Sequence, residues 1–131
     1  MPVQTGARVS AGFDEERFAA LLNLAGLDTA IELTRRLDED LTRVDLSLAD
    51  ALAGADRAVL HVQSHILLSI AGTIGATLVY DLAKRLNALV RGTDQAAGSS
   101  LIAEISAEIR VALNDVIARV RFTRSELTRS S

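Results

Sequence analysis

The sequence contains no cysteine, a single proline and few aromatic residues. Without cysteine the chain can form no disulfide, no thiolate nucleophile and no zinc-finger site. Aromatic residues make up only 3% of the chain but apolar residues 49%, so Leu, Ile, Val and Ala must build the core. This balance is typical of all-helical proteins, and 131 residues suffice for one domain.

The chain also has no excess of basic residues. The formal net charge is −3, and no basic stripe occurs along the chain. Nucleic acid is therefore not expected as a partner. The N-terminal residues lack the charged-then-apolar pattern of a secretory signal. Together with the lack of cysteine, this favours a cytoplasmic location.

The longest stretch without Asp, Glu, Lys or Arg lies between Arg57 and Asp81 and is long enough to cross a bilayer. Its interior argues against a membrane span. Polar residues occupy positions 61 and 63–65, and the sequence Gly72–Gly75 interrupts the apolar run. We therefore interpret the stretch as a helical hairpin in a protein core and expect no membrane contact.

Apolar residues recur every three to four positions, which predicts an all-α protein. We expect helices over about residues 13–26, 29–54, 56–71, 74–90 and 101–122. Short loops make successive helices antiparallel neighbours. The predicted fold is an antiparallel four-helix up-down bundle over residues 13–123, with an additional N-terminal helix across one end. Residues 1–12 are expected to be a flexible tail and residues 124–131 a frayed one.

Polar residues and glycines predict where the helices begin and end. Asp14 and Asp56 are good N-cap residues for the first and third helices. The sequence Thr29–Glu32 has the pattern of a capping box at the start of the second helix. Gly72–Thr73 is the predicted turn between the third and fourth helices, and Gly92–Ser100 is a predicted flexible loop.

The third predicted helix carries both histidines of the chain, His61 and His65. On a helical wheel, at about 100° per residue, His65 points away from the core face. The predicted core face contains Val59, Leu60, Ile66, Leu67, Ile70 and Ile74. Small or uncharged residues surround His65, namely Ala58, His61, Ser69 and Gly72. A side chain on such a low, open face can be reached by a large partner, as chemistry between two proteins requires.

The residues that follow this histidine form a recognisable pattern. The matching positions are His65, Leu67, Ala71, Gly72, Ile74, Gly75 and Ala76. This pattern and the order of the helices over residues 13–122 resemble the histidine phosphotransfer (HPt) domain family. The resemblance implies that His65 carries a phosphoryl group between receiver-domain aspartates in a two-component phosphorelay.

The same resemblance implies the partners. They are a response-regulator receiver domain and a hybrid sensor histidine kinase. The chain would be a phosphocarrier rather than a true enzyme, because the receiver domain supplies the aspartate, the Mg²⁺ and most of the catalytic groups. We therefore expect no cofactor of its own and a monomeric protein.

Two departures from the family pattern bear on the activity. Leu68 replaces the family's lysine, which is thought to hold the phosphoryl charge, and Ser69 and Ile70 replace the following Gly and Ser. Leu68 favours an alternative function, a degenerate HPt-fold interaction module that docks on receiver domains without efficient transfer. The intact His65 favours the phosphotransfer protein.

Pairing across the predicted antiparallel hairpin suggests supporting groups. Residues on its two helices pair with a nearly constant sum of numbers, which sets Asn87 opposite His65. The family often has an amide here that hydrogen-bonds the histidine. Lys84 and Arg91, one turn to either side, could supply positive charge to the phosphoryl group. Alternatively, both are ordinary solvated residues.

Two further readings concern the same helix. His61 and His65 have a metal-ligand spacing, but Gln63 stands where a zinc-protease helix has its glutamate, and no third ligand is evident. We expect no metal site and interpret His61 as a solvated neighbour that tunes the local charge. The predicted docking face for the receiver domain comprises Ala58, Val62, Leu68, Ser69 and Gly72.

Overall fold

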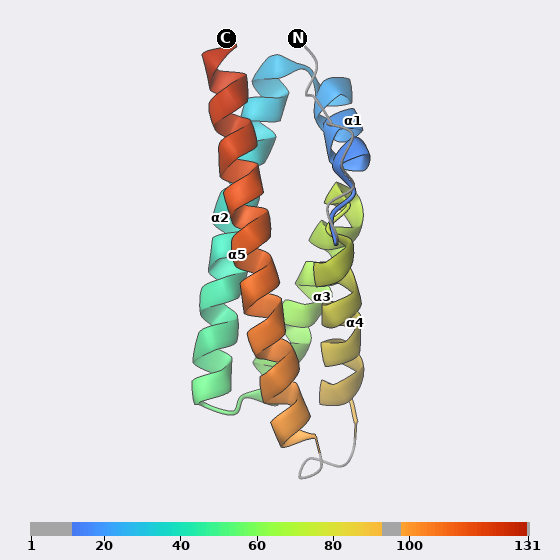
Figure 1. The fold of residues 1–131 in the computed structure, drawn as a ribbon. Coiled ribbons are helices and arrows are strands. Elements are labelled where there is room, and N and C mark those ends of the chain that lie inside the picture. The colour runs from blue at the N-terminus through green and yellow to red at the C-terminus, as the bar shows by residue number, and fades with distance from the viewer. Residues whose placement is uncertain (1–11, 93–97, 131) are drawn as a thin grey trace.

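The computed structural model describes residues 12–92 and 98–130, and within them the chain forms five α-helices (Figure 1). They are α1 (Glu15–Ala25), α2 (Leu27–Ala53), α3 (Arg57–Ile74), α4 (Thr77–Val90) and α5 (Ser99–Arg129). The predicted all-α class is confirmed. Residues 1–11 of the predicted tail and 93–97 of the predicted loop lie outside the described residues.

Two of the predicted N-caps are confirmed. The Asp14 carboxylate accepts a hydrogen bond from the Arg17 backbone N–H at 3.1 Å, at the start of α1. The Asp56 carboxylate accepts one from the Val59 N–H, also at 3.1 Å, at the start of α3. Each carboxylate satisfies a backbone donor that has no partner within its helix.

The predicted start of α2 is wrong. The helix begins at Leu27, two residues before Thr29, and its N-cap is Gly26, which makes no side-chain hydrogen bond. Gly26 has φ 84° and ψ 164°, a conformation that glycine adopts far more readily than other residues. The chain therefore passes from α1 to α2 through a single residue. Glu32, expected in the capping box, pairs with Arg35 instead.

The turn between α3 and α4 lies at Gly75 rather than at Gly72 and Thr73. Helix α3 continues to Ile74, and Gly75 ends it in the left-handed conformation with φ 83°. The Gly75 N–H donates to the Ala71 carbonyl at 3.0 Å. Gly72 lies inside the helix. Gly75 supplies the left-handed backbone conformation that ends the helix, so no turn is needed at Gly72.

The chain before α1 is held against this turn. The Asp14 N–H donates to the Gly75 carbonyl at 2.7 Å, and the Leu78 N–H donates to the Gly12 carbonyl at 3.0 Å. A Cβ atom on Gly75 would lie 2.9 Å from the Asp14 carbonyl oxygen. The approach of the two backbones therefore requires glycine at position 75.

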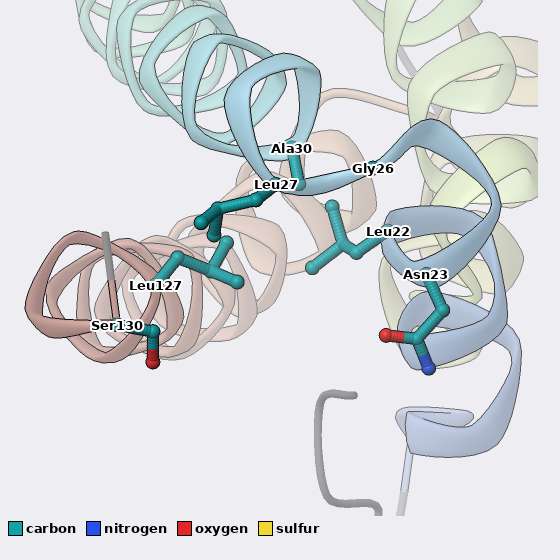
Figure 2. Close-up of a pocket in the computed structure, with 7 residues that line it drawn as sticks. All are labelled: Leu22, Asn23, Gly26, Leu27, Ala30, Leu127 and Ser130. Atoms are coloured by element: carbon teal, nitrogen blue, oxygen red, sulfur yellow. The ribbon is translucent and has the colours of Figure 1, made fainter. Parts of the chain in front are cut away.

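Helix α5 continues through the segment that was expected to fray. It ends at Arg129, and Leu127 is buried near the helix end. Leu127 lines an open pocket together with Leu22, Leu27 and Ala30, where α5 meets the junction of α1 and α2 (Figure 2). Burial of Leu127 against these residues supplies the packing energy that keeps the last turns helical.

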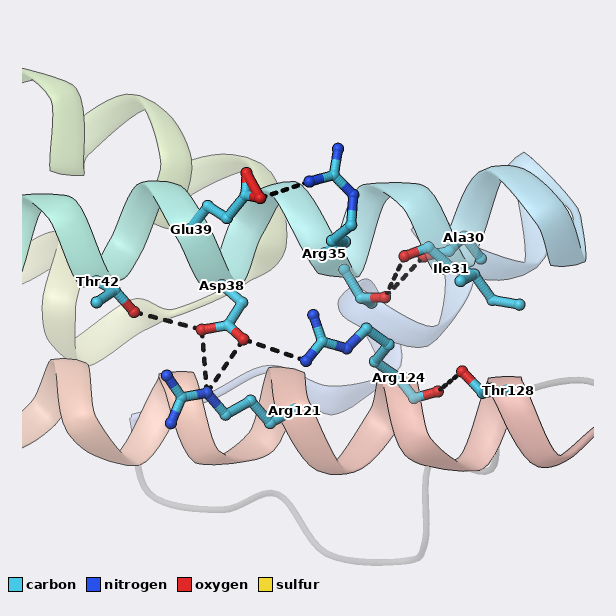
Figure 3. A network of polar contacts seen from close by, with 10 residues as sticks. Ala30, Ile31, Arg35, Asp38, Glu39, Thr42, Arg121, Arg124 and Thr128 are labelled. Carbon is cyan, nitrogen blue, oxygen red and sulfur yellow. Dashed lines mark hydrogen bonds and ion pairs between the residues drawn. The ribbon is translucent and has the colours of Figure 1, made fainter.

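Ion pairs between α2 and α5 show that these helices run in opposite directions. Asp45 accepts hydrogen bonds from Arg110, with the closest pair of atoms 2.9 Å apart. Two turns earlier on α2, Asp38 contacts Arg121 at 3.0 Å and Arg124 at 3.3 Å (Figure 3). The hydrogen bond to Asp45 and the charge of Asp45 raise the pKa of Arg110.

The helices enclose an aliphatic core. The most extensive helix contacts are those of α3 with α4 and of α2 with α5, followed by α4 with α5 and α2 with α3. Helix α1 contacts α2 and α3, and Figure 1 shows it at the end of α3. The largest fully buried side chains include Leu41, Leu48, Leu60, Leu67, Leu86, Ile105, Ile109 and Leu113. Among the described helices, none combines the length and apolar character needed to cross a membrane.

Candidate functional site

His65 lies in the middle of α3 and is exposed, as the helical wheel predicted. The residues on either side of it set this orientation. Ser64, which precedes it, is fully buried, and Leu67 two positions later is fully buried as well. His65 therefore has a firmly packed backbone and an imidazole open to a partner.

The core face of α3 differs from the wheel at several positions, and Val59, predicted to be in the core, is only half-buried. Its buried residues are Leu60, Ser64, Leu67, Ala71 and Ile74. Ile66, predicted to be in the core, is 37% exposed, and Ile70 is half-buried. The wheel ranked positions by apolar character alone. Ser64 can replace an apolar residue because its hydroxyl is satisfied by hydrogen bonds.

Those hydrogen bonds include the one made by Asn87. The Asn87 side-chain amide donates to the Ser64 hydroxyl oxygen at 3.0 Å, and this hydroxyl donates to the His61 carbonyl at 2.9 Å. Asn87 was expected to bond to the imidazole of His65. It contacts the preceding residue instead, because the buried hydroxyl lies at the seam between α3 and α4.

The positions of the predicted cations follow from Asn87. Lys84 and Arg91 are three residues before it and four residues after it, and both are exposed. They therefore lie about one turn to either side of the contact with Ser64. The Asn87–Ser64 contact supports the pairing from which these two positions were predicted.

The predicted docking face is mostly open. Val62 is 53% exposed, and Ala58 and Ser69 are exposed as well. Gly72 is half-buried, and a Cβ atom there would lie 3.5 Å from the Tyr80 ring. Leu68 departs from the prediction, since its half-buried side chain packs against the core.

Sequence reasoning missed two residues of this region. Tyr80 of α4 lies beside Gly72, and the pairing sum that was applied to Asn87 would have predicted this contact. Ser64 was overlooked as the partner of Asn87. A hydroxyl one position before His65, in an otherwise apolar helix, was the available signal.

Within residues 12–92 and 98–130, neither histidine forms an ion pair with an acidic residue. The basic member of every ion pair found there is an arginine. No cluster of three or more His, Cys, Asp or Glu side chains suited to a metal ion occurs in these ranges. The site thus offers two exposed imidazoles on α3, His65 within the motif and His61 one turn before it.

Comparisons with protein-family models, curated proteins and solved structures give no match to this chain. Its function is therefore inferred from its own residues.

Proposed function

We propose that this chain is a histidine phosphotransfer protein, in which His65 carries a phosphoryl group between receiver-domain aspartates. The observation that carries the proposal is the exposed His65 within its motif. Leu67, Ala71, Ile74 and Ala76 of the motif are all buried. These residues specify the scaffold, and the histidine is the reactive group that this scaffold presents.

The proposed fold supports this function. We propose that α2–α5 form an antiparallel four-helix up-down bundle to which α1 is added at one end. The cyclic pattern of helix contacts, α2 with α3, α3 with α4, α4 with α5 and α5 with α2, fits such a bundle. In this arrangement His65 projects from the side of the helical bundle, where a receiver domain has room to dock.

The proposed chemistry needs one protein nucleophile. The lone pair of a neutral imidazole nitrogen forms a bond to phosphorus while the O–P bond of the receiver's aspartyl phosphate breaks. The receiver's aspartate is thereby returned to its carboxylate form, and the onward transfer reverses these steps. Phosphoryl transfer depends mainly on positioning and charge stabilisation. The HPt resemblance implies that the receiver domain contributes the Mg²⁺ and most of the other groups.

The charge of the phosphohistidine is the open point in this scheme. Leu68 packs against the core, so the position of the family's lysine provides no cation. We propose that Lys84 of α4 supplies positive charge from the neighbouring helix, with Arg91 further along the same side. A cation on an exposed surface has a modest effect. Transfer would therefore depend largely on the partner.

A second candidate function follows from the same observation. With Leu68 packed against the core, the chain could dock on receiver domains and transfer the phosphoryl group poorly. Both candidates use the same docking face and the same partners, a response-regulator receiver domain and a hybrid sensor histidine kinase. These partners act in the cytoplasm, where we expect this chain to act.

One experiment separates the two candidates. The full chain is incubated with a panel of phosphorylated receiver domains, and the label on the chain is tested for lability in acid and stability in base. We expect such a label on the wild type and on His61→Gln, the matched control one turn away, but not on His65→Gln. Label retained in His65→Gln contradicts the proposal, whereas binding without label supports the docking module.

A further inference from the structure

An uncharged row of side chains follows the outer side of α5. Val111 is 74% exposed and Phe122 is 66% exposed. These residues are 11 positions apart, about three helical turns, so they lie on the same side of the helix. Ala107 and Ala118 continue the same row and are exposed too. We call Ala107, Val111, Ala118 and Phe122 the α5 stripe.

The stripe is wider than an isolated exposed side chain. Single apolar residues on a surface are common, but a row of them spanning several turns marks an interaction surface. Asn114 and Ser125, which are exposed and uncharged, extend one edge of the stripe. The stripe repeats every 11 residues, which is about 3.67 residues per turn. Such a repeat keeps one face directed at a partner helix along its length.

Charges of opposite sign flank the stripe. Arg110 and Arg121 lie on one side, again 11 residues apart. Asp115 and Glu126 lie on the other with the same spacing, and each contacts an arginine of the same helix, Arg119 and Arg129. Asp45 binds Nε and Nη2 of Arg110, and Asp38 binds Nε of Arg121. The guanidinium groups are thus held at the edge of the stripe.

We propose that the α5 stripe binds a second copy of this chain, with the two α5 helices parallel about a two-fold axis. In this arrangement the basic side of each helix faces the acidic side of the other. Arg110 of one copy lies opposite Asp115 of the second, and Arg121 lies opposite Glu126. Both pairs have the five-residue offset of ion pairs between parallel helices, and the symmetry forms each pair twice.

The orientation follows from the charges. An antiparallel pair would set the acidic side of one α5 against the acidic side of the other, because a two-fold axis across the helices brings identical edges together. Complementary charges therefore select the parallel arrangement and a second copy as the occupant. The proposed dimer differs from the monomer expected from the sequence.

Such a dimer leaves the candidate site free. Helix α5 contacts α2 and α4, and α3 contacts α1, α2 and α4, so in the described part of the chain α5 and α3 do not pack on each other. His65 is exposed on α3, a helix that does not contact α5 in the described part of the chain. Both copies could therefore present His65 outward at the same time.

The first test is the oligomeric state of the full chain, measured by sedimentation equilibrium over a range of concentrations. We expect a dimer for the wild type. For Val111→Glu and Phe122→Glu we expect association to weaken about tenfold or more, which shifts the equilibrium toward monomer. Leu24→Glu is the matched control, because Leu24 is 88% exposed on α1 and lies outside the stripe. Circular dichroism checks that each variant is folded. A monomer at every concentration, or equal weakening by Leu24→Glu, overturns the proposal.

The second test reports the orientation. The chain has no cysteine, so a single introduced cysteine can crosslink only two copies. In a parallel dimer both Ala107→Cys and Ala118→Cys face their own equivalents, and each should form a disulfide dimer under mild oxidation. An antiparallel dimer cannot bring both positions onto the axis, so crosslinking at only one overturns the parallel arrangement. Neither test depends on phosphoryl transfer, so the dimer can fail while the proposed function stands.

Discussion

Replacement of Gly75 by alanine tests how the segment before α1 is held against the turn between α3 and α4. Two effects oppose the added methyl group. The φ of 83° is left-handed, which costs a residue with a Cβ atom about 1–2 kcal/mol. The new Cβ would also lie 2.9 Å from the Asp14 carbonyl oxygen, so the backbone must move.

The movement weakens a specific contact. The Asp14 N–H donates to the Gly75 carbonyl at 2.7 Å, and a backbone hydrogen bond contributes about 0.5–1.5 kcal/mol to stability. The two effects together predict that Gly75→Ala lowers the free energy of unfolding by about 2–3 kcal/mol. That is a large share of the roughly 5–15 kcal/mol by which folded proteins are stable.

Two substitutions calibrate this value in the same urea-unfolding assay. Ala55 is a non-glycine residue with positive φ, 51°, so Ala55→Gly should stabilise the chain by about 1 kcal/mol through relief of the backbone strain alone. Gly72→Ala adds a Cβ in ordinary contact with Tyr80 inside a helix and should stabilise by about 0.5–1 kcal/mol.

The comparison isolates the packed segment. If Gly75→Ala destabilises by no more than Ala55→Gly stabilises, the strain accounts for the whole effect, and the contact between Asp14 and Gly75 contributes nothing. That result would refute the reasoning. A larger loss at Gly75, together with a gain at Gly72, shows that the two motif glycines have different roles: one permits a backbone turn and the other keeps the docking face low.

Three further predictions concern the candidate site. Ser69→Arg should weaken receiver-domain binding about tenfold or more, measured by calorimetry, because it raises a charged side chain on the docking face while the circular dichroism spectrum stays unchanged; unchanged affinity would place docking elsewhere. Lys84→Ala should slow phosphoryl transfer up to about fivefold, whereas Leu68→Lys should change the rate little if Lys84 already supplies the charge. The measurement is the rate of transfer of the labelled phosphoryl group, and no change in either variant would mean that the partner alone stabilises the phosphoryl charge. Asn87→Ala should cost about 0.5–1.5 kcal/mol of stability through loss of its bond to Ser64. A double-mutant cycle with Ser64→Ala should show coupling, and additive losses would mean that the bond is not formed in solution.

Much of the fold was predictable from local physics. The periodicity of Leu, Ile and Val indicated helices, and Asp14 and Asp56 marked two of their starts, because a carboxylate that accepts a backbone N–H needs only neighbouring residues. The exposure of His65 was predictable for the same reason: its position relative to Leu60 and Leu67 on one helix is fixed by helical geometry.

The tertiary structure decided what depends on contacts between distant segments. Gly75 rather than Gly72 became the turn because Asp14, far away in sequence, packs against it. Helix α5 continues past residue 123 because Leu127 is buried against the junction of α1 and α2.

The candidate site shows the same division. Its nucleophile and its low face follow from the sequence of one helix. The partner of Asn87 does not follow from the sequence. Ser64 and His65 are adjacent in the chain, and only the side of α3 that packs on α4 decides which of them Asn87 contacts. Likewise, the sequence identified Leu68 as the residue in place of a lysine, but only the packing of α3 on its neighbours turned that side chain toward the core. Local periodicity determines which residues share a helix face, and the packing of whole helices decides which face is buried.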